Sequence, residues 1–190
     1  MISELAGQFL LRYAKKVIEE YVTNNKKIPI PDKYPKELDE KKGVFVTIYK
    51  RKPNNAMELR GCMGIPLSKT KIIENVRDAA ISSSHDPRFL PLSAHEMPYI
   101  LLEISILTEP ELIKVENPQD YLKVIRPGID GLIIEKNIMT GLLLPQVWKE
   151  IPKKEDFLTA LCYKAGLLPD SWMDKSVKIY RFQVQSFKEK

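Results

Sequence analysis

The order in which helical and strand-like patterns follow one another is the feature that most limits how this chain can fold. Helices and hairpins are interspersed without a regular βαβ rhythm, which argues against a parallel sheet with crossover helices. The patterns therefore predict an α+β fold in which a mainly antiparallel sheet is flanked by helices. The predicted helices cover residues 4–23, 71–83 and 157–165, and the predicted strands cover residues 44–50, 57–65, 100–106, 131–136, 141–144 and 177–187.

Side-chain periodicity and turn residues place these elements. Apolar residues recur at helical spacing through residues 5–21, and Ser3 is a suitable N-cap for that helix. The turn at residues 53–55 (PNN) joins the first two strands into a hairpin. Apolar residues alternate over residues 100–106, which predicts a strand with one buried face. Three prolines within residues 24–39 exclude a regular helix or a central strand, so we expect a surface loop there.

Composition limits the class of protein. The 190 residues, 44% hydrophobic and 29% charged, are typical of a globular chain that forms one domain or two unequal lobes. No apolar run approaches the roughly 18 residues that span a bilayer, and residues 1–16 lack the basic segment of a signal peptide. Two cysteines do not make a disulfide framework of the kind that secreted proteins carry. We therefore expect the protein in the reducing environment of the cytoplasm. A bond between Cys62 and Cys162 stays open, because intracellular proteins of hyperthermophiles can contain disulfides.

The charge pattern argues only weakly for a polyanionic partner. The formal net charge is +5, and the isoelectric point is near 9.0. Basic residues occur mostly as scattered doublets beside acidic ones, with a single triplet at residues 50–52 (KRK). We therefore favour a solvated surface over a nucleic-acid-binding stripe. The sequence has no glycine-rich phosphate loop, CxxC pair or spaced histidine pair, so we predict neither cofactor nor metal.

The most informative segment is residues 59–64, which read LRGCMG within a predicted strand. Side chains alternate along a strand, so Arg60 and Cys62 are expected on one face. A guanidinium beside a thiol favours the thiolate and lowers the pKa of the cysteine. The alternative is a buried structural cysteine, with Arg60 paired to an acid elsewhere. The segment alone leaves both interpretations open.

Two glycines border the cysteine. Gly61 contributes no side chain between Leu59 and Met63, which are expected in the core, and so allows another backbone or helix to approach closely. Gly64 ends the segment and is a candidate for lining a binding site.

The sequence resembles the AMMECR domain family, named for a human chromosomal region associated with Alport syndrome, midface hypoplasia and elliptocytosis. The resemblance extends over nearly the whole chain and is carried by residues 59–64, 86–92, 131–134, 143–147 and 157–167. It implies one AMMECR-like domain over residues 1–190, with a larger lobe, a smaller lobe and a cleft between them. Relatives occur beside or fused to Memo-type proteins and radical S-adenosylmethionine enzymes, which are candidate partners. The resemblance implies no particular reaction.

Residues 85–88 (HDPR) are a second candidate constellation, in a loop between two apolar elements. His85 can be a general base for Cys62, with Asp86 orienting it. For Asp86 we favour the alternative, in which it begins a turn with Pro87 at the second position and Arg88 anchors the loop by ion pairing. Catalytic and structural interpretations of His85 are equally open.

Three further residues complete the candidates. Glu103 interrupts an apolar strand and is either solvated or paired, with Arg60 as a possible partner. Gln146, at a strand end, can donate hydrogen bonds into the expected cleft. Cys162 shares a helical face with core residues, so we predict that it packs in the core.

These candidates support three functional hypotheses. The first is an enzyme, or an enzyme-assisting subunit, that uses the Cys62 thiolate on a small molecule or a modified residue. Arg60 and His85 complete its catalytic set, and Gly61, Gly64, Asp86, Arg88, Glu103 and Gln146 line its cleft. The alternatives are a nucleic-acid-binding module and a partner-binding regulatory module, both without catalysis.

Overall fold

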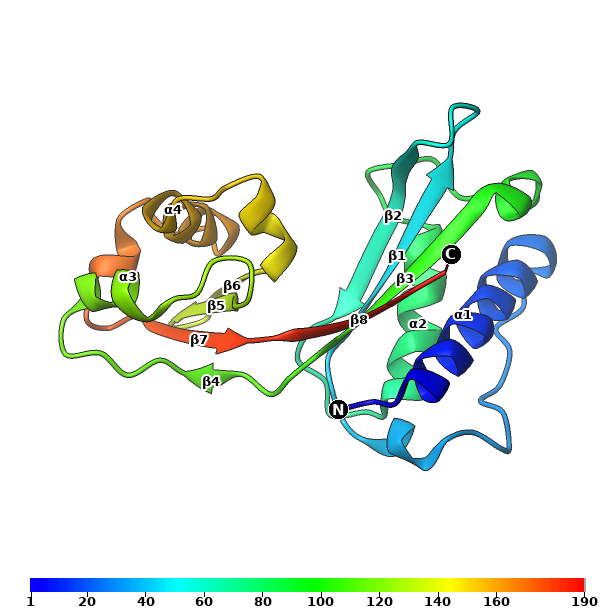
Figure 1. Cartoon of the computed structure of the whole chain (residues 1–190), viewed down its shortest axis with the longest axis horizontal. Coiled ribbons are helices and arrows are strands. Elements are labelled where there is room, and N and C mark those ends of the chain that lie inside the picture. Colours follow the sequence, from blue (N-terminus) through cyan, green and yellow to red (C-terminus); the bar gives the residue numbers. More distant parts are fainter. Residues whose placement is uncertain (190) are drawn as a thin grey trace. The chain divides into compact units, whose positions relative to one another are not determined.

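The computed structural model of the chain describes residues 1–189, which form two compact units. The first unit contains Met1–Leu107 and the C-terminal segment from Gln185, and the second contains Thr108–Val184. Each unit has its own four-stranded sheet with helices beside it (Figure 1). The predicted α+β fold with mainly antiparallel sheet is confirmed, because every described strand pairing in both sheets is antiparallel.

In the first unit, two helices pack on one face of a sheet (Figure 1). Its strands occur in the order β2-β1-β3-β8. The strands are β1 (Val44–Arg51), β2 (Met57–Ile65), β3 (Ile100–Leu107) and β8 (Val184–Lys188), and the helices are α1 (Glu4–Asn24) and α2 (Ile72–Ser84), with short 3-10 helices η1 (Lys36–Asp39) and η2 (Ala94–Tyr99).

Alternation in β1 defines the two faces of this sheet. Val44, Val46 and Ile48 are fully buried in one cluster with residues of α1 and α2. Thr47 and Tyr49 therefore lie on the opposite face, which we call the helix-free face. At the start of α1, the Ser3 hydroxyl accepts a hydrogen bond from the backbone of Ala6, which confirms the expected N-cap.

Helix α2 approaches β2 closely at Gly61. A methyl group at this position would lie 2.2 Å from the carbonyl oxygen of Ser83, near the end of α2. The Ser83 hydroxyl also accepts a hydrogen bond from the backbone N–H of Met63 at 3.0 Å. The predicted close backbone approach at Gly61 is confirmed, and it positions the end of α2 against the strand that carries Cys62.

The second unit has strand order β4-β7-β5-β6. Its strands are β4 (Glu111–Leu112), β5 (Gly131–Lys136), β6 (Met139–Leu143) and β7 (Lys178–Phe182), its helices are α3 (Tyr121–Val124) and α4 (Lys154–Lys164), and its 3-10 helices are η3 (Pro118–Asp120), η4 (Pro145–Lys149) and η5 (Ser171–Met173).

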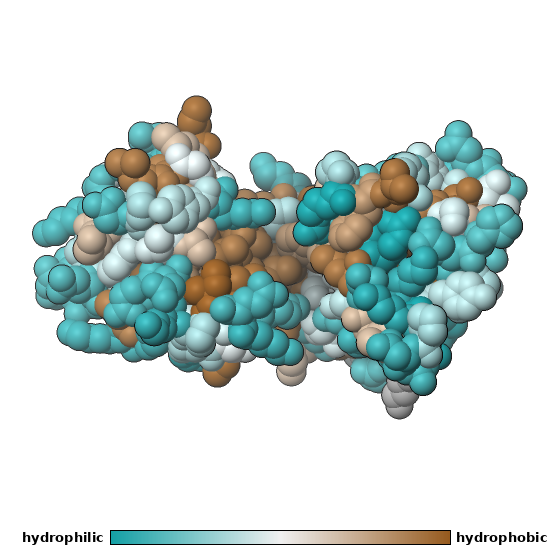
Figure 2. Space-filling model, turned by 90° about the horizontal axis from the view of Figure 1, so that it is seen from above, coloured by the Kyte–Doolittle hydropathy of each residue, from teal (hydrophilic) through white to brown (hydrophobic). Residues whose placement is uncertain are grey.

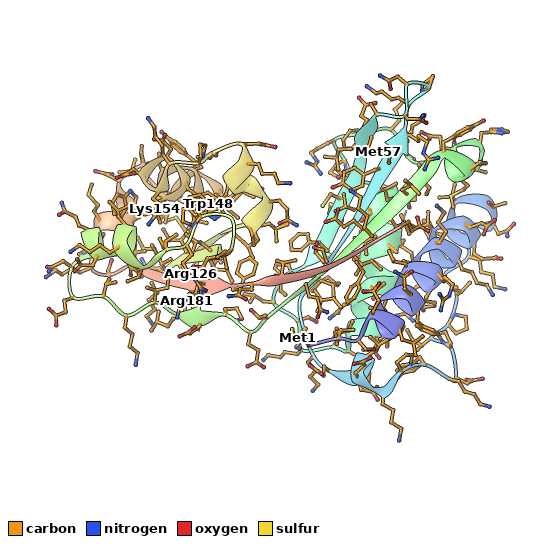
Figure 3. The ribbon with its side chains drawn as sticks, in the orientation of Figure 1. Met1, Met57, Arg126, Trp148, Lys154 and Arg181 are labelled. Carbon is orange, nitrogen blue, oxygen red and sulfur yellow. The ribbon has the colours of Figure 1, made fainter. Side chains whose placement is uncertain are left out.

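The core of the second unit includes an aromatic stack and a cysteine. The rings of Trp148 and Phe157 are stacked with centroids 3.7 Å apart. Cys162 is fully buried in the same cluster, which confirms its predicted core position. Trp148 and Arg126, both labelled in Figure 3, bind Asp130: the indole N–H donates to its carbonyl oxygen, and the guanidinium pairs with its buried carboxylate.

The prediction of one strand over residues 177–187 is wrong. The chain forms β7 in the sheet of the second unit and then β8 in the sheet of the first. Gln183 separates them, and its backbone N–H donates to the hydroxyl of Thr108 at 2.8 Å instead of to a strand. Alternation continues across this break, so the pattern alone does not reveal a change of sheet.

Hydrophilic side chains cover much of the surface seen in Figure 2. Within residues 1–189, no helix is both long enough and apolar enough to cross a membrane. Cys62 and Cys162 are free thiols, so the disulfide left open by the sequence does not occur in the structure.

Candidate functional site

A β-bulge at Arg60 changes the geometry expected around Cys62. Ile48 lies opposite Gly61, but Tyr49 lies opposite Leu59, so Arg60 is an extra residue without a partner in β1. A bulge interrupts the alternation of side chains along a strand. Cys62 pairs with Thr47 and so lies on the helix-free face.

Arg60 binds Glu96 of η2 rather than the cysteine. Its Nε lies 2.9 Å from Oε1 of Glu96, and its Nη2 lies 3.0 Å from Oε2. Lys50 also binds Glu96, at 2.9 Å. These cations hold the pKa of the Glu96 carboxyl well below its usual range, with Arg60 the largest contributor. The prediction that Arg60 activates Cys62 is therefore wrong, and the alternative of Arg60 paired to a distant acid is confirmed.

The Cys62 thiol is half-buried and forms a hydrogen bond with a hydroxyl group. Its Sγ lies 3.2 Å from Oγ1 of Thr47 on the neighbouring strand. Burial, the largest effect, raises the pKa of the Cys62 thiol, and the charges of Asp86 and Glu103 also raise it; the lowering by the Thr47 hydrogen bond and by the charge of Arg88 is smaller than these effects together. The expected depression of the cysteine pKa is thus wrong, because desolvation penalises the thiolate.

A buried carboxylate connects the loop after α2 to β2. The side chain of Asp86 is only 1% exposed. One of its oxygens accepts the backbone N–H of Cys62 at 2.8 Å, and the carboxylate accepts Nε and Nη2 of Arg88 at 3.0 and 2.6 Å. The Arg88 guanidinium holds the pKa of Asp86 well below its usual range. The carbonyl of Asp86 accepts the N–H of Phe89 at 2.9 Å, so the predicted turn and loop anchor are confirmed.

Arg88, rather than Arg60, is the cation beside Cys62. Its Nη2 lies 3.4 Å from the carbonyl oxygen of Cys62, while its side chain is 57% exposed. The sequence identified Arg88 as a loop anchor and as a residue of the expected cleft, but not as the cation beside the cysteine. The ion pairing of Arg88 was expected without a named partner, and its contact with Cys62 depends on how α2 packs against β2.

His85 is not brought to the cysteine. Its Nδ1 lies 2.8 Å from the Ser84 hydroxyl, and its ring packs edge-on against Tyr21 of α1 with centroids 5.1 Å apart. Within residues 1–189, the hydrogen-bond partners of Cys62 do not include His85. A general-base role for His85 at Cys62 is therefore not supported, and packing at the end of α2 accounts for its position.

Glu103 shares the helix-free face with Cys62, since Thr47 lies opposite both residues. Lys188 approaches Glu103 at 3.6 Å and lies over the ring of Tyr49, 4.7 Å from its centroid. Tyr49 also donates its hydroxyl to Glu103 at 3.4 Å. Burial, followed by the charge of Glu103, raises the pKa of Tyr49 to about 12. Of the two interpretations left open, Glu103 is therefore paired, with Lys188 and Tyr49, whereas the candidate partner Arg60 binds Glu96 instead.

Two other candidates lie apart from this cluster. Gly64 pairs with Phe45, and a methyl group there would come within 2.4 Å of the Phe45 ring, so this glycine makes room for an aromatic side chain. Gln146 lies in η4 of the second unit and is exposed. Its hydrogen bonds into a cleft stay a prediction. No group of three metal-binding side chains occurs in the part of the chain that the structure describes.

The basic triplet at the β1 end is largely paired with acids. Lys50 binds Glu96 at 2.9 Å and Lys52 binds Glu58 at 3.1 Å. The charge that would attract a nucleic-acid backbone is thereby reduced at the place where the sequence concentrates it.

The AMMECR1 family matches residues 11–187. The chain belongs to the AMMECR1 family. Protein MJ0810 of Methanocaldococcus jannaschii is 50% identical, covering 96% of this chain and 90% of that protein. Protein PYRAB00100 of Pyrococcus abyssi is 47% identical, with the same coverage.

A solved structure supports the fold. The uncharacterised protein PH0010 from Pyrococcus horikoshii matches with a TM-score of 0.90 and 44% identity, covering 100% of this chain and 94% of that one. In the present AMMECR1-family chain, the residues gathered around the cysteine are Thr47, Asp86, Arg88 and, on the same face, Glu103. Together they place a thiol, a hydroxyl, a cation and two carboxylates near one another.

Proposed function

We propose that this AMMECR1-family protein is a cytoplasmic enzyme, or a subunit that assists an enzyme, and that it acts on a small molecule or modified residue through the Cys62 thiol. One observation carries the proposal: the buried Asp86 carboxylate binds both the backbone N–H of Cys62 and the guanidinium of Arg88. A single anchor therefore holds a cation beside a thiol, which is the kind of preorganised arrangement that covalent catalysis uses. Memo-type and radical S-adenosylmethionine proteins are candidate partners.

The chemistry begins from a protonated thiol. Burial raises the pKa of Cys62, so at neutral pH the cysteine resists indiscriminate reaction. Once deprotonated, a thiolate of higher pKa is the stronger nucleophile. The hydrogen bond from Thr47 and the charge of Arg88 favour the thiolate when it forms. Arg88 thus takes the role that the sequence suggested for Arg60.

Alkylation of the native protein tests whether Cys62 can react. We expect iodoacetamide to modify Cys62 with a midpoint above the free-thiol value of about 8.5, because burial raises its pKa. Cys162 is fully buried and provides an internal control that reacts only after unfolding. Peptide mass mapping measures both sites. If Cys62 reacts no faster than Cys162 in the folded protein, a catalytic thiol is ruled out.

Allele replacement separates a catalytic role from a purely regulatory one. In cells that carry the gene, we expect Cys62→Ser to produce the phenotype of a gene deletion, since serine retains the shape but not the nucleophile. Cys162→Ala is the matched control and should behave as wild type if the protein accumulates normally on a blot. A Cys62→Ser strain that grows as wild type would favour a partner-binding module without catalysis.

A further inference from the structure

We infer that the substrate acted on at Cys62 carries an anionic oxygen group, a carboxylate or a phosphate, which Arg88 binds. This inference rests on the proposed function and specifies its substrate class. Its starting point is how Arg88 uses its donors. Nε and Nη2 bind Asp86, and Nη2 also contacts the Cys62 carbonyl. Among residues 1–189, Nη1 has no hydrogen-bond partner, so two N–H donors are available on a side chain that is 57% exposed.

The guanidinium is held in place by its surroundings. Asp86 is almost entirely buried, and it also accepts the backbone N–H of Arg88 at 3.1 Å, which fixes the loop on which the side chain stands. The guanidinium carbon lies 5.6 Å from the centroid of the Phe89 ring. A cation oriented in this way loses little further entropy when it binds an oxyanion, and charge-assisted bonds to carboxylate or phosphate are the strong ones.

The position of the guanidinium connects this anion site to the thiol. Nη2 contacts the carbonyl oxygen of Cys62, and that oxygen and Sγ belong to one residue. The charge of Arg88 also acts on the thiol, so we take an anion bound at Nη1 to be a neighbour of the sulfur. Two carboxylates lie near the thiol, and each is paired with a cation: Asp86 with Arg88 at 2.6 Å and Glu103 with Lys188 at 3.6 Å. Ion pairing reduces the repulsion that these carboxylates would exert on an incoming anion.

A second ion pair of the same form provides a comparison. In the second unit, Arg126 binds the buried Asp130 through Nε at 3.1 Å and Nη2 at 2.6 Å. This pair belongs to the second unit, whereas Cys62 and Arg88 belong to the first. Arg126→Gln therefore removes an equivalent ion pair and serves as the control for Arg88→Gln.

Two alkylating reagents of nearly equal size, one charged and one neutral, test the inference. The Cys62 sulfur displaces iodide from iodoacetate or iodoacetamide: an S–C bond forms, the C–I bond breaks, and the thiol proton passes to solvent. We expect the rate ratio of iodoacetate to iodoacetamide to be about fivefold or more above that of a neutral cysteine peptide, as one charge-assisted hydrogen bond allows. The ratio should fall to the peptide value in Arg88→Gln, persist in Arg126→Gln and decrease with salt.

The outcomes separate this inference from the proposed function. If Cys62 reacts with both reagents at the peptide ratio, the anion site is overturned while a reactive thiol stands. If Arg88→Gln retains the wild-type ratio, Arg88 is not the anion ligand. If neither reagent modifies native Cys62, both proposals fail. Arg88→Lys, which keeps the charge, should keep part of the preference and so guards against a loop distorted by Arg88→Gln.

Competing anions identify the group. At constant ionic strength, acetate and inorganic phosphate should both slow the iodoacetate reaction, and the stronger competitor indicates whether the substrate carries a carboxylate or a phosphate. No slowing by either anion contradicts the inference.

Discussion

At the scale of single residues, the chemistry of Cys62 depends on the balance between burial and two favourable neighbours. Burial raises the pKa of the thiol, whereas the Thr47 hydroxyl and the Arg88 charge lower it. Of these two groups, the Thr47 hydroxyl is the one that hydrogen-bonds directly to the sulfur, at 3.2 Å. Thr47 is therefore the side chain that most directly adjusts the reactivity of the thiol.

Replacing this hydroxyl should make the cysteine less acidic. In Thr47→Val the hydrogen bond to the thiolate is lost, so we expect the midpoint of the alkylation pH profile to rise by about one unit, the equivalent of one hydrogen bond of roughly 1 kcal/mol. Thr47→Ser keeps the hydroxyl and should retain the wild-type midpoint. A Thr47→Val profile that is unchanged or shifted to lower pH would show that the hydroxyl does not stabilise the thiolate.

At the scale of elements, the site depends on the contact between α2 and β2. The loop that carries Asp86 and Arg88 begins where α2 ends, and β2 carries Cys62 at the outer edge of its sheet. Because an edge strand has no neighbour on one side, its outward backbone groups need other partners. The Asp86 carboxylate is such a partner, because it accepts a hydrogen bond from the backbone N–H of Cys62. This hydrogen bond attaches the loop to the edge of β2.

Adding one methyl group at Gly61 should disturb this contact. In Gly61→Ala the new carbon would lie 2.2 Å from the backbone oxygen of Ser83, so the helix must move away from the strand. We expect the free energy of unfolding to fall by about 2 kcal/mol or more, as for other overpacked sites, with a lower denaturation midpoint in urea. Gly166→Ala, where only a positive φ opposes a side chain, should cost about 1 kcal/mol. Equal stability of Gly61→Ala and wild type would contradict the close packing.

At the scale of the whole molecule, the two units have separate cores, and tryptophan fluorescence reports on only one of them. Both tryptophans of the chain, Trp148 and Trp172, lie in the second unit. The two carboxylates whose pKa values are held far below their usual range by arginine, Asp86 and Glu96, lie in the first. Acid should therefore destabilise the first unit by protonating these carboxylates, and the tryptophans, which lie in the second unit, do not report on this change directly.

The sign of this pH dependence follows from the lowered pKa values. A carboxyl whose pKa is lower in the folded state stabilises the fold above its unfolded value near 4, and that stabilisation is lost as pH falls through the folded pKa. We expect the free energy of unfolding of the first unit, followed by hydrogen exchange, to decrease below about pH 5, by about 2 kcal/mol for each carboxylate. Asp86→Asn and Glu96→Gln should each be less stable at pH 7 and less sensitive to acid. If a variant loses stability in acid as wild type does, the carboxylate that it lacks does not contribute to the acid sensitivity.

The sequence alone was sufficient for features whose causes are local. Periodicity placed the helices and hairpins, an aspartate followed by a proline predicted the turn at residues 86–89, and the missing side chain of Gly61 predicted a close backbone approach. The helices, hairpins and turn depend on residues close together in the sequence. The close approach at Gly61 follows from the absence of a side chain, whichever segment packs there.

Only the tertiary structure decided which groups surround the thiol. The bulge at Arg60 arises from pairing with β1, and the partner of Arg60 lies 36 residues away. Arg88, 26 residues from Cys62, comes to the strand because α2 packs on it. The change of sheet between β7 and β8 is likewise invisible in an unbroken alternation. Strand register, desolvation and ion pairing between distant residues depend on packing of the whole unit, and a linear pattern does not contain that information.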